Sequence, residues 1–200
     1  MPDSVHYMPL PRRRDPLYLS DDARGPSPRA DTRGASRGME RVPENILNIW
    51  QNIVTIVAET CGVDVCLITR FDPPEEECVN VSGSAAGRFA PGERWSMSGS
   101  FAGTVFESKS RLLVGDAARD GRWERCSGVR GGMVSYLGYP LFHGDGRVFG
   151  TICVLDSAVI RSGNRFDAIM KECKSMIEEH LRMMDSGEYA AVRGEVVRNR

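Results

Sequence analysis

The amino-acid sequence predicts an α+β fold, in which two amphipathic helices flank an antiparallel sheet that a further helix and a long loop interrupt. Two apolar segments joined by a Gly/Asp-rich turn indicate a β-hairpin over residues 135–157. Apolar residues recur at helical spacing over residues 44–60 and again after Asn164, which we expect to cap the final helix. Both hairpin arms are apolar on two faces, so we expect central strands covered on both sides. Gly138 and Gly150 within these arms indicate the close approach of another backbone.

The first helix and the first strands follow from local signals. Pro43 precedes the helix where proline is favoured, and Gly62 is placed to cap its C-terminus. The β-branched run at residues 65–71 predicts a strand, and residues 79–82 predict a short return strand. The segment between them, residues 72–77, holds two prolines and three consecutive glutamates. We interpret it as a turn, and its charge run as a solvated surface.

The middle of the chain predicts a short helix, a short strand and a long loop. Ser98 or Ser100 can cap a helix over residues 100–109. Residues 112–115 predict a strand, and residues 116–133 a polar loop with one helical turn. Loops of this length in compact domains are often functional, so this segment is a candidate cover for a binding site.

Composition divides the chain into one domain and two tails. Residues 1–41 are rich in Pro, Gly, Ser, Asp and Arg and have no apolar periodicity, so we expect a disordered N-terminal tail. The domain spans residues 42–185, and residues 186–200 form a flexible C-terminal tail. Translation from Met39 is an alternative that the intact mass of the native protein would test. A further alternative is that the chain is a fragment of a longer protein.

Charge and hydropathy restrict the partners that we expect. A formal net charge of -1 gives no reason to expect nucleic acid or a membrane surface as a partner. No apolar run approaches the roughly 20 residues that a membrane-spanning helix needs, and the first forty residues are polar without the apolar run of a secretory leader, so we do not expect secretion. We therefore expect a cytoplasmic protein whose cysteines are reduced and buried.

No catalytic or metal-binding motif occurs in the sequence. Signatures of nucleophilic, zinc, dinucleotide and phosphate sites are absent. The three histidines, His6, His143 and His180, lie far apart, and we expect them to be surface or packing residues. We therefore predict no catalytic residue and no metal site.

Three segments, in this order, carry a resemblance to a known family. WSMSGSFAGTVF at residues 95–106 and LLVGDA at residues 112–117 are followed by YLGYPL, GDG and VFGTICVLD within the hairpin. Together they resemble the middle helix, the following strand and the closing strands of the GAF family of small sensor domains. The resemblance covers roughly residues 44–185. It implies a six-stranded antiparallel sheet with the terminal helices on one face and a ligand pocket, covered by a helix and a loop, on the other.

The resemblance also implies which side chains surround that pocket. They come from the middle helix, the long loop and the adjacent strands, and they combine aromatic walls with a few polar contacts. The candidate ligand-binding residues are Trp95, Phe101, Phe106, Asp116, Arg122, Trp123, Cys126, Met133 and Tyr136. The alternative is that these aromatic side chains fill the interior as part of the core.

The functions known in the family give three hypotheses for this chain. The first is a bacterial, non-enzymatic sensor that binds an unknown small molecule or a signalling partner, dimerises through its terminal helices and acts on a separate output protein. The second is an enzyme similar to free methionine-sulfoxide reductases, which use loop cysteines, although this loop holds only Cys126. The third is a ligand-free dimerisation module. No covalent bilin is expected, because Ser127 follows Cys126 where bilin-binding members usually have histidine, and no histidine is placed to ligate haem.

Overall fold

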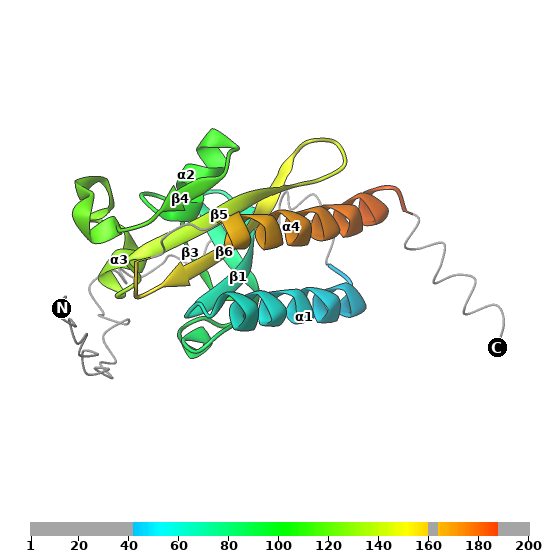
Figure 1. The fold of residues 1–200 in the computed structure, drawn as a ribbon. Helices are drawn as coiled ribbons and strands as arrows, with labels where there is room; N and C mark the ends of the chain where they lie inside the picture. Colours follow the sequence, from blue (N-terminus) through cyan, green and yellow to red (C-terminus); the bar gives the residue numbers. More distant parts are fainter. Residues whose placement is uncertain (1–41, 160–163, 188–200) are drawn as a thin grey trace. The chain divides into compact units, whose positions relative to one another are not determined.

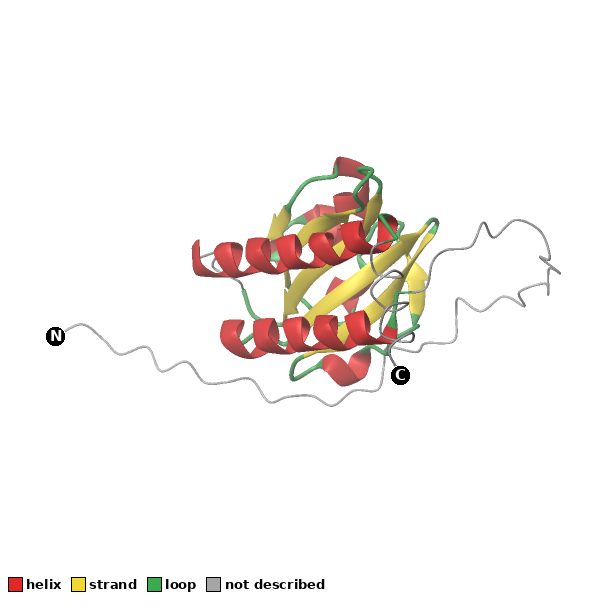
Figure 2. Ribbon diagram, turned by 90° about the vertical axis from the view of Figure 1, so that its right-hand side faces the viewer, coloured by secondary structure: helices red, strands yellow, loops and turns green. Residues whose placement is uncertain are grey.

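The computed structural model describes residues 42–159 and 164–187. Within them, six strands form one antiparallel sheet in the order β3-β2-β1-β6-β5-β4. Two long helices, α1 and α4, lie side by side on one face, and α2 and several short helices cover the other (Figures 1 and 2). The predicted α+β architecture is confirmed.

The central strands are those that the apolar sequence runs predicted. β1 pairs with both β2 and β6, and β6 also pairs with β5. The hairpin is paired from Ser135 opposite Asp156 to Phe142 opposite Val148. The strands are β1 (Val65–Asp72), β2 (Glu75–Ser82), β3 (Arg94–Ser96), β4 (Leu112–Val114), β5 (Ser135–Phe142) and β6 (Val148–Asp156).

Capping residues fix the ends of the first two helices. The N–H of Gly62, at φ 66°, donates to the Ala58 carbonyl and ends α1 as predicted. Ser100 caps α2, because its side chain accepts the N–H of Gly103. Asn164 is the first residue of α4, so the prediction that it precedes the helix was wrong by one position. The helices are α1 (Glu44–Cys61), α2 (Phe101–Ser108), α3 (Ser127–Arg130) and α4 (Asn164–Asp185), with 3-10 turns at Ala86–Arg88, Ala117–Arg119 and Gly121–Trp123.

The core between the long helices and the sheet is apolar and includes one histidine. Trp50 of α1 is fully buried, packs edge-on against Phe149 and donates from Nε1 to His180 Nδ1 at 3.1 Å. Burial lowers the pKa of His180, which favours the neutral ring that accepts this bond. His180 is therefore a packing residue, as predicted.

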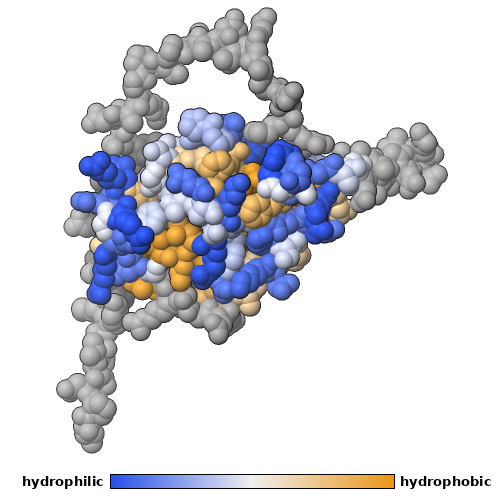
Figure 3. All heavy atoms as spheres, turned by 90° about the horizontal axis from the view of Figure 1, so that it is seen from above, coloured by the Kyte–Doolittle hydropathy of each residue, from blue (hydrophilic) through white to orange (hydrophobic). Residues whose placement is uncertain are grey.

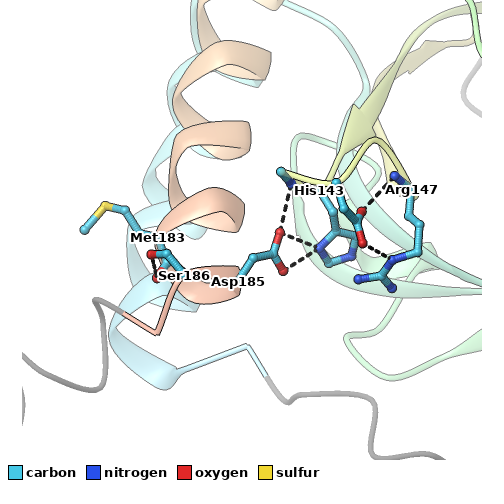
Figure 4. A network of polar contacts seen from close by, with 7 residues as sticks. His143, Arg147, Met183, Asp185 and Ser186 are labelled. Carbon is cyan, nitrogen blue, oxygen red and sulfur yellow. Dashed lines mark hydrogen bonds and ion pairs between the residues drawn. The ribbon is translucent and has the colours of Figure 1, made fainter.

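The hairpin turn contacts the end of α4. The Asp185 carboxylate accepts the N–H of Gly144 at 2.8 Å and lies 3.0 Å from His143 Nδ1 (Figure 4). Arg147 pairs with Asp145 across the same turn. His143 thus joins the hairpin to α4, and the described residues contain no group of three or more His, Cys, Asp or Glu side chains that could hold a metal ion.

The start of β2 is the main difference between prediction and structure. β2 begins at Glu75 and not at residue 79, so the glutamates belong to a strand. Because side chains alternate along a strand, Glu75 is exposed and Glu77 partly exposed, whereas Glu76 points into the interior and is only 2% exposed. The interpretation of this run as a solvated turn was therefore wrong for Glu76. Its sequence lacks the apolar alternation that identifies a strand.

Two glycines in the hairpin have different neighbours. A Cβ at Gly150 would lie 1.8 Å from the Thr69 carbonyl oxygen, so the predicted approach of another backbone is confirmed there. A Cβ at Gly138 would lie 2.1 Å from the Tyr136 hydroxyl oxygen. At Gly138 the prediction was wrong, because the missing side chain makes room for a tyrosine ring of the same strand.

Several expectations concern segments at the borders of the described residues. The N-terminal tail with Met39, and residues 188–200 of the C-terminal tail, lie outside them.

None of the described helices has the length and apolar character needed to cross a lipid bilayer. Seen from above Figure 1, the surface is largely polar, with apolar side chains gathered in patches between the polar ones (Figure 3).

Candidate ligand-binding site on the α2 face of the sheet

The face of the sheet under α2 has an aromatic centre. Phe101 of α2 stacks on Tyr136 of β5, with ring centroids 4.9 Å apart, and packs at 4.7 Å against Trp123 from the long loop. Cys126 and Met133 from the same loop are buried in this cluster. Residues distant in the sequence thus form one closed interior between α2, the loop and the sheet.

Glu76 is a buried acid at the edge of this interior. Its Oε1 accepts a hydrogen bond from Trp95 Nε1 at 2.5 Å, and Ser100 Oγ lies 3.4 Å from the same oxygen. Its Oε2 is buried and has no hydrogen-bond partner among the described residues. Burial raises the pKa of Glu76 to about 7, although the hydrogen bond from Trp95 and the nearby hydroxyl groups of Thr69 and Ser100 oppose the rise. At neutral pH this carboxyl therefore exists in both protonation states.

Ser100 connects Glu76 to the start of α2. The Ser100 hydroxyl caps the helix by accepting the Gly103 N–H at 2.8 Å, and its single proton is shared between Glu76 and the Met97 carbonyl, 3.0 Å away. A Cβ at Gly103 would lie 2.1 Å from that carbonyl oxygen, so the first turn of α2 packs tightly on the preceding segment. A change at Glu76 therefore acts directly on the N-terminus of α2.

The Tyr136 hydroxyl is a second buried polar group without a partner among the described residues. Tyr136 is 2% exposed, and its hydroxyl lies near Thr151 and Cys153, but no described group meets the geometry of a hydrogen bond with it. Burial raises the pKa of Tyr136 well above its usual range, and the charges of Cys153 and Glu76 act in the same direction. Tyr136 and Glu76 are thus near enough to interact electrostatically.

A pair of threonines lies between these two groups. Thr69 of β1 and Thr151 of β6 are both buried and hydrogen-bond to each other at 2.9 Å. Thr69 is next to Glu76, and Thr151 is next to Tyr136. Polar side chains therefore extend across four adjacent strands, β2, β1, β6 and β5, on the face that α2 covers.

The cysteines of this face are held as thiols. Burial raises the pKa values of Cys78 and Cys153 to about 12, with nearby glutamates adding to the effect. Both therefore carry a proton at neutral pH. Cys126 is also buried, at the N-terminus of the four-residue helix α3.

The residues predicted for the pocket fall into two groups. Six of them pack together on the α2 face, namely Trp95, Phe101, Trp123, Cys126, Met133 and Tyr136. Phe106 packs beside them against Phe71, with ring centroids 5.2 Å apart. Asp116 pairs with Arg119 in the loop, and the side chain of Arg122 is 79% exposed and bound to Asp120. The polar groups of the interior are therefore not the two charged residues that the sequence suggested.

Sequence reasoning missed Glu76 and the two threonines. The available signal was weak: Glu76 lies two residues before Cys78, and both occupy the inward positions of β2. Recognising it required knowing that the strand begins at Glu75 and which of its faces is buried.

The GAF domain family model matches residues 45–172. The chain belongs to the GAF domain family. No curated protein matches the sequence.

Solved GAF structures share this fold at low sequence identity. The chain is similar to the GAF domain of an Acinetobacter phosphoenolpyruvate-protein phosphotransferase, with 17% identity, a TM-score of 0.56 and coverage of 68% of this chain and 81% of that chain. It is also similar to the free methionine-R-sulfoxide reductase of Neisseria meningitidis, solved with its substrate. The sequence identity is 17%, the TM-score is 0.56, and the match covers 68% of this chain and 77% of that chain. A third similar structure is the GAF domain of Thermosynechococcus elongatus PixJ in its blue-light absorbing form. The sequence identity is 14%, the TM-score is 0.57, and the match covers 75% of this chain and 94% of that chain. At these identities the likeness shows a common fold.

Proposed function

We propose that this GAF domain is a sensor module that binds a small molecule in the interior between α2 and the sheet. The observation that carries the proposal is a set of buried polar atoms on that face without a hydrogen-bond partner among the described residues, namely Glu76 Oε2, Trp123 Nε1 and the Tyr136 hydroxyl. Buried polar atoms in folded proteins are nearly always hydrogen-bonded, because leaving one without a partner costs about 1–3 kcal/mol. A bound molecule with polar groups would supply the missing partners.

The aromatic centre supports the same proposal. Small-molecule sites are mainly apolar, with a few well-placed polar groups that fix the orientation of the ligand. Phe101, Trp123 and Tyr136 provide stacked and tilted rings, and Glu76 provides a charged group at their edge. In the alternative that we described, a filled core, these polar groups would remain unsatisfied.

We propose a non-enzymatic role for this site. Thiol-dependent reduction requires an accessible thiolate, whereas Cys78 and Cys153 are buried thiols and Cys126 is only 2% exposed. Consumption of free methionine sulfoxide with a thiol reductant, abolished by Cys126→Ser, would overturn this part of the proposal.

Transmission of the signal is proposed to pass from α2 to the terminal helices of a homodimer. Glu76 and Ser100 couple the interior to the start of α2, so a ligand at Glu76 would shift the population of α2 positions. On the opposite face, Ile49 and Ile56 of α1 are 38% and 59% exposed, and Met176 of α4 is 51% exposed. Exposed apolar side chains on both long helices suit a second copy of the chain, and a separate protein would receive the output.

Native mass spectrometry tests the ligand proposal. The full chain is purified without a tag, incubated with a small-molecule extract of its source cells, and compared with Tyr136→Phe and with Tyr139→Phe, which removes a hydroxyl from the opposite face of β5. We expect a stoichiometric extra mass on the wild type and on Tyr139→Phe, and a reduced one on Tyr136→Phe. A clean protein mass in all three samples would overturn the proposal.

A further inference from the structure

Glu76 lacks a positively charged partner. Among residues 42–159 and 164–187, no Lys, Arg or His forms an ion pair with it, and the ionisable groups near it include Cys78, Cys153 and Tyr136, which carry no positive charge. The nearby Arg94 forms its ion pairs with Asp72, Glu75 and Glu77 instead. A carboxylate taken out of water without a counter-charge is costly, so a positive charge beside Glu76 would stabilise its ionised form.

The remaining oxygen of Glu76 also needs a hydrogen-bond donor. Oε1 is already bound to the Trp95 indole N–H, whereas Oε2 is buried and unsatisfied. A positively charged group without N–H would balance the charge but leave this oxygen unpaired. A ligand group that satisfies Glu76 should therefore carry both a positive charge and an N–H that can donate to Oε2.

The aromatic side chains of the same interior favour a cation as well. The Trp95 ring is held at Glu76 by its indole hydrogen bond, and Phe101 stacks on Tyr136 across the interior. The faces of aromatic rings attract cations, most strongly when water is excluded. The Tyr136 hydroxyl can accept a second N–H or bind another polar group of the same molecule.

We propose that the interior binds a small primary or secondary amine in its ammonium form, with an N–H of the ligand donating to Glu76 Oε2. The inference rests on the proposed sensor function and specifies its ligand class. It excludes quaternary ammonium compounds, which have no N–H, and anions, which Glu76 repels.

This binding mode releases a proton near neutral pH. The ligand pairs with ionised Glu76, whose pKa burial raises to about 7 in the free protein. The ionised fraction then grows by about tenfold between pH 6 and pH 8, and the affinity for an amine grows with it, because only the competent form binds. An amine with an ordinary pKa near 10 remains charged throughout this range.

The Trp95 indole resonance reports directly on this event. The chain contains 3 tryptophans, so an NMR spectrum of the indole N–H groups is simple, and Trp95→Phe identifies the relevant peak. In wild-type protein we expect this peak to titrate with a midpoint near pH 7. Adding ethylammonium chloride, at a NaCl-matched ionic strength, should lower the midpoint in a saturable way, and ethanol should not.

Two variants separate the site from general effects. Glu76→Gln keeps an oxygen for the indole N–H but cannot ionise, so neither titration nor an ethylammonium response should remain. Glu75→Gln, the same change on the exposed neighbour, should behave as the wild type. The comparison of ethylammonium with ethanol on the wild type stands even if a variant fails to fold.

Three outcomes would overturn the inference: no effect of ethylammonium beyond NaCl, an equal effect of ethanol, or an equal response in Glu76→Gln. If such a result came with an extra mass in native mass spectrometry, the ligand class would be wrong and the sensor function would stand. If the extra mass were also missing, both proposals would fail.

Discussion

Replacing Glu76 by glutamine should change how the stability of the domain depends on pH. Burial raises the pKa of Glu76 from its ordinary value of 4.5 to about 7 in the fold. The folded state therefore binds the Glu76 proton more tightly than the unfolded chain does. Its contribution to stability is fully present below pH 4.5 and is lost as the pH rises through 7.

The two pKa values give the size of the effect. They differ by about 2.5 pH units, and each unit corresponds to about 1.4 kcal/mol, so complete ionisation costs the fold about 3–4 kcal/mol. Most of this loss, about 2–3 kcal/mol, falls between pH 5 and pH 8. Glutamine does not titrate, so Glu76→Gln should avoid it.

Urea denaturation at several pH values between 5 and 8 measures this directly. The free energy of unfolding of Glu76→Gln, relative to the wild type, should rise by about 2–3 kcal/mol from pH 5 to pH 8. Glu75→Gln should follow the wild-type curve, because Glu75 is exposed. Parallel curves for the wild type and Glu76→Gln would refute the reasoning, since they would show that Glu76 titrates alike in the folded and unfolded states.

Three further predictions address other parts of the fold. Ser100→Ala removes the cap of α2 and should lower the free energy of unfolding by about 1 kcal/mol in urea denaturation; no loss would contradict the capping role. Gly150→Ala forces a Cβ to 1.8 Å from the carbonyl oxygen of β1 and should abolish soluble expression, whereas Gly121→Ala, with open space around it, should change the midpoint of thermal unfolding little. Ile56→Asp places a charge on the exposed face of α1 and should convert the proposed dimer to a monomer in light scattering; a mass that does not change with the variant would contradict this interface.

The sequence was sufficient for the elements whose signal is local. The hairpin arms are apolar at nearly every position, and α1 repeats its apolar residues at helical spacing, so these elements could be identified without their neighbours. The caps at Gly62 and Ser100 are local as well. The order of these elements, with the family resemblance, gave the sheet and its two covered faces.

The polar part of the site depends on contacts that the sequence does not display. Glu76 becomes an interior residue only because β2 pairs with β1 in one register, which turns alternate side chains of β2 inward. Conversely, Arg122 lies in the predicted loop but binds its neighbour Asp120 at the surface. Charge runs and loop positions therefore pointed to polar residues that pair within the loop, whereas the predicted aromatic residues, which any covered interior buries, lie within it or beside it.

The most direct test of the central claim is the electron density between Glu76 and Tyr136 in a crystal of protein purified from its own organism. We predict non-protein density that contacts Glu76 Oε2 and the Tyr136 hydroxyl, two of the buried polar atoms on this face that have no hydrogen-bond partner among the described residues. Density for water alone at these atoms, or side chains that satisfy each other, would contradict the account and identify this interior as a core without a ligand.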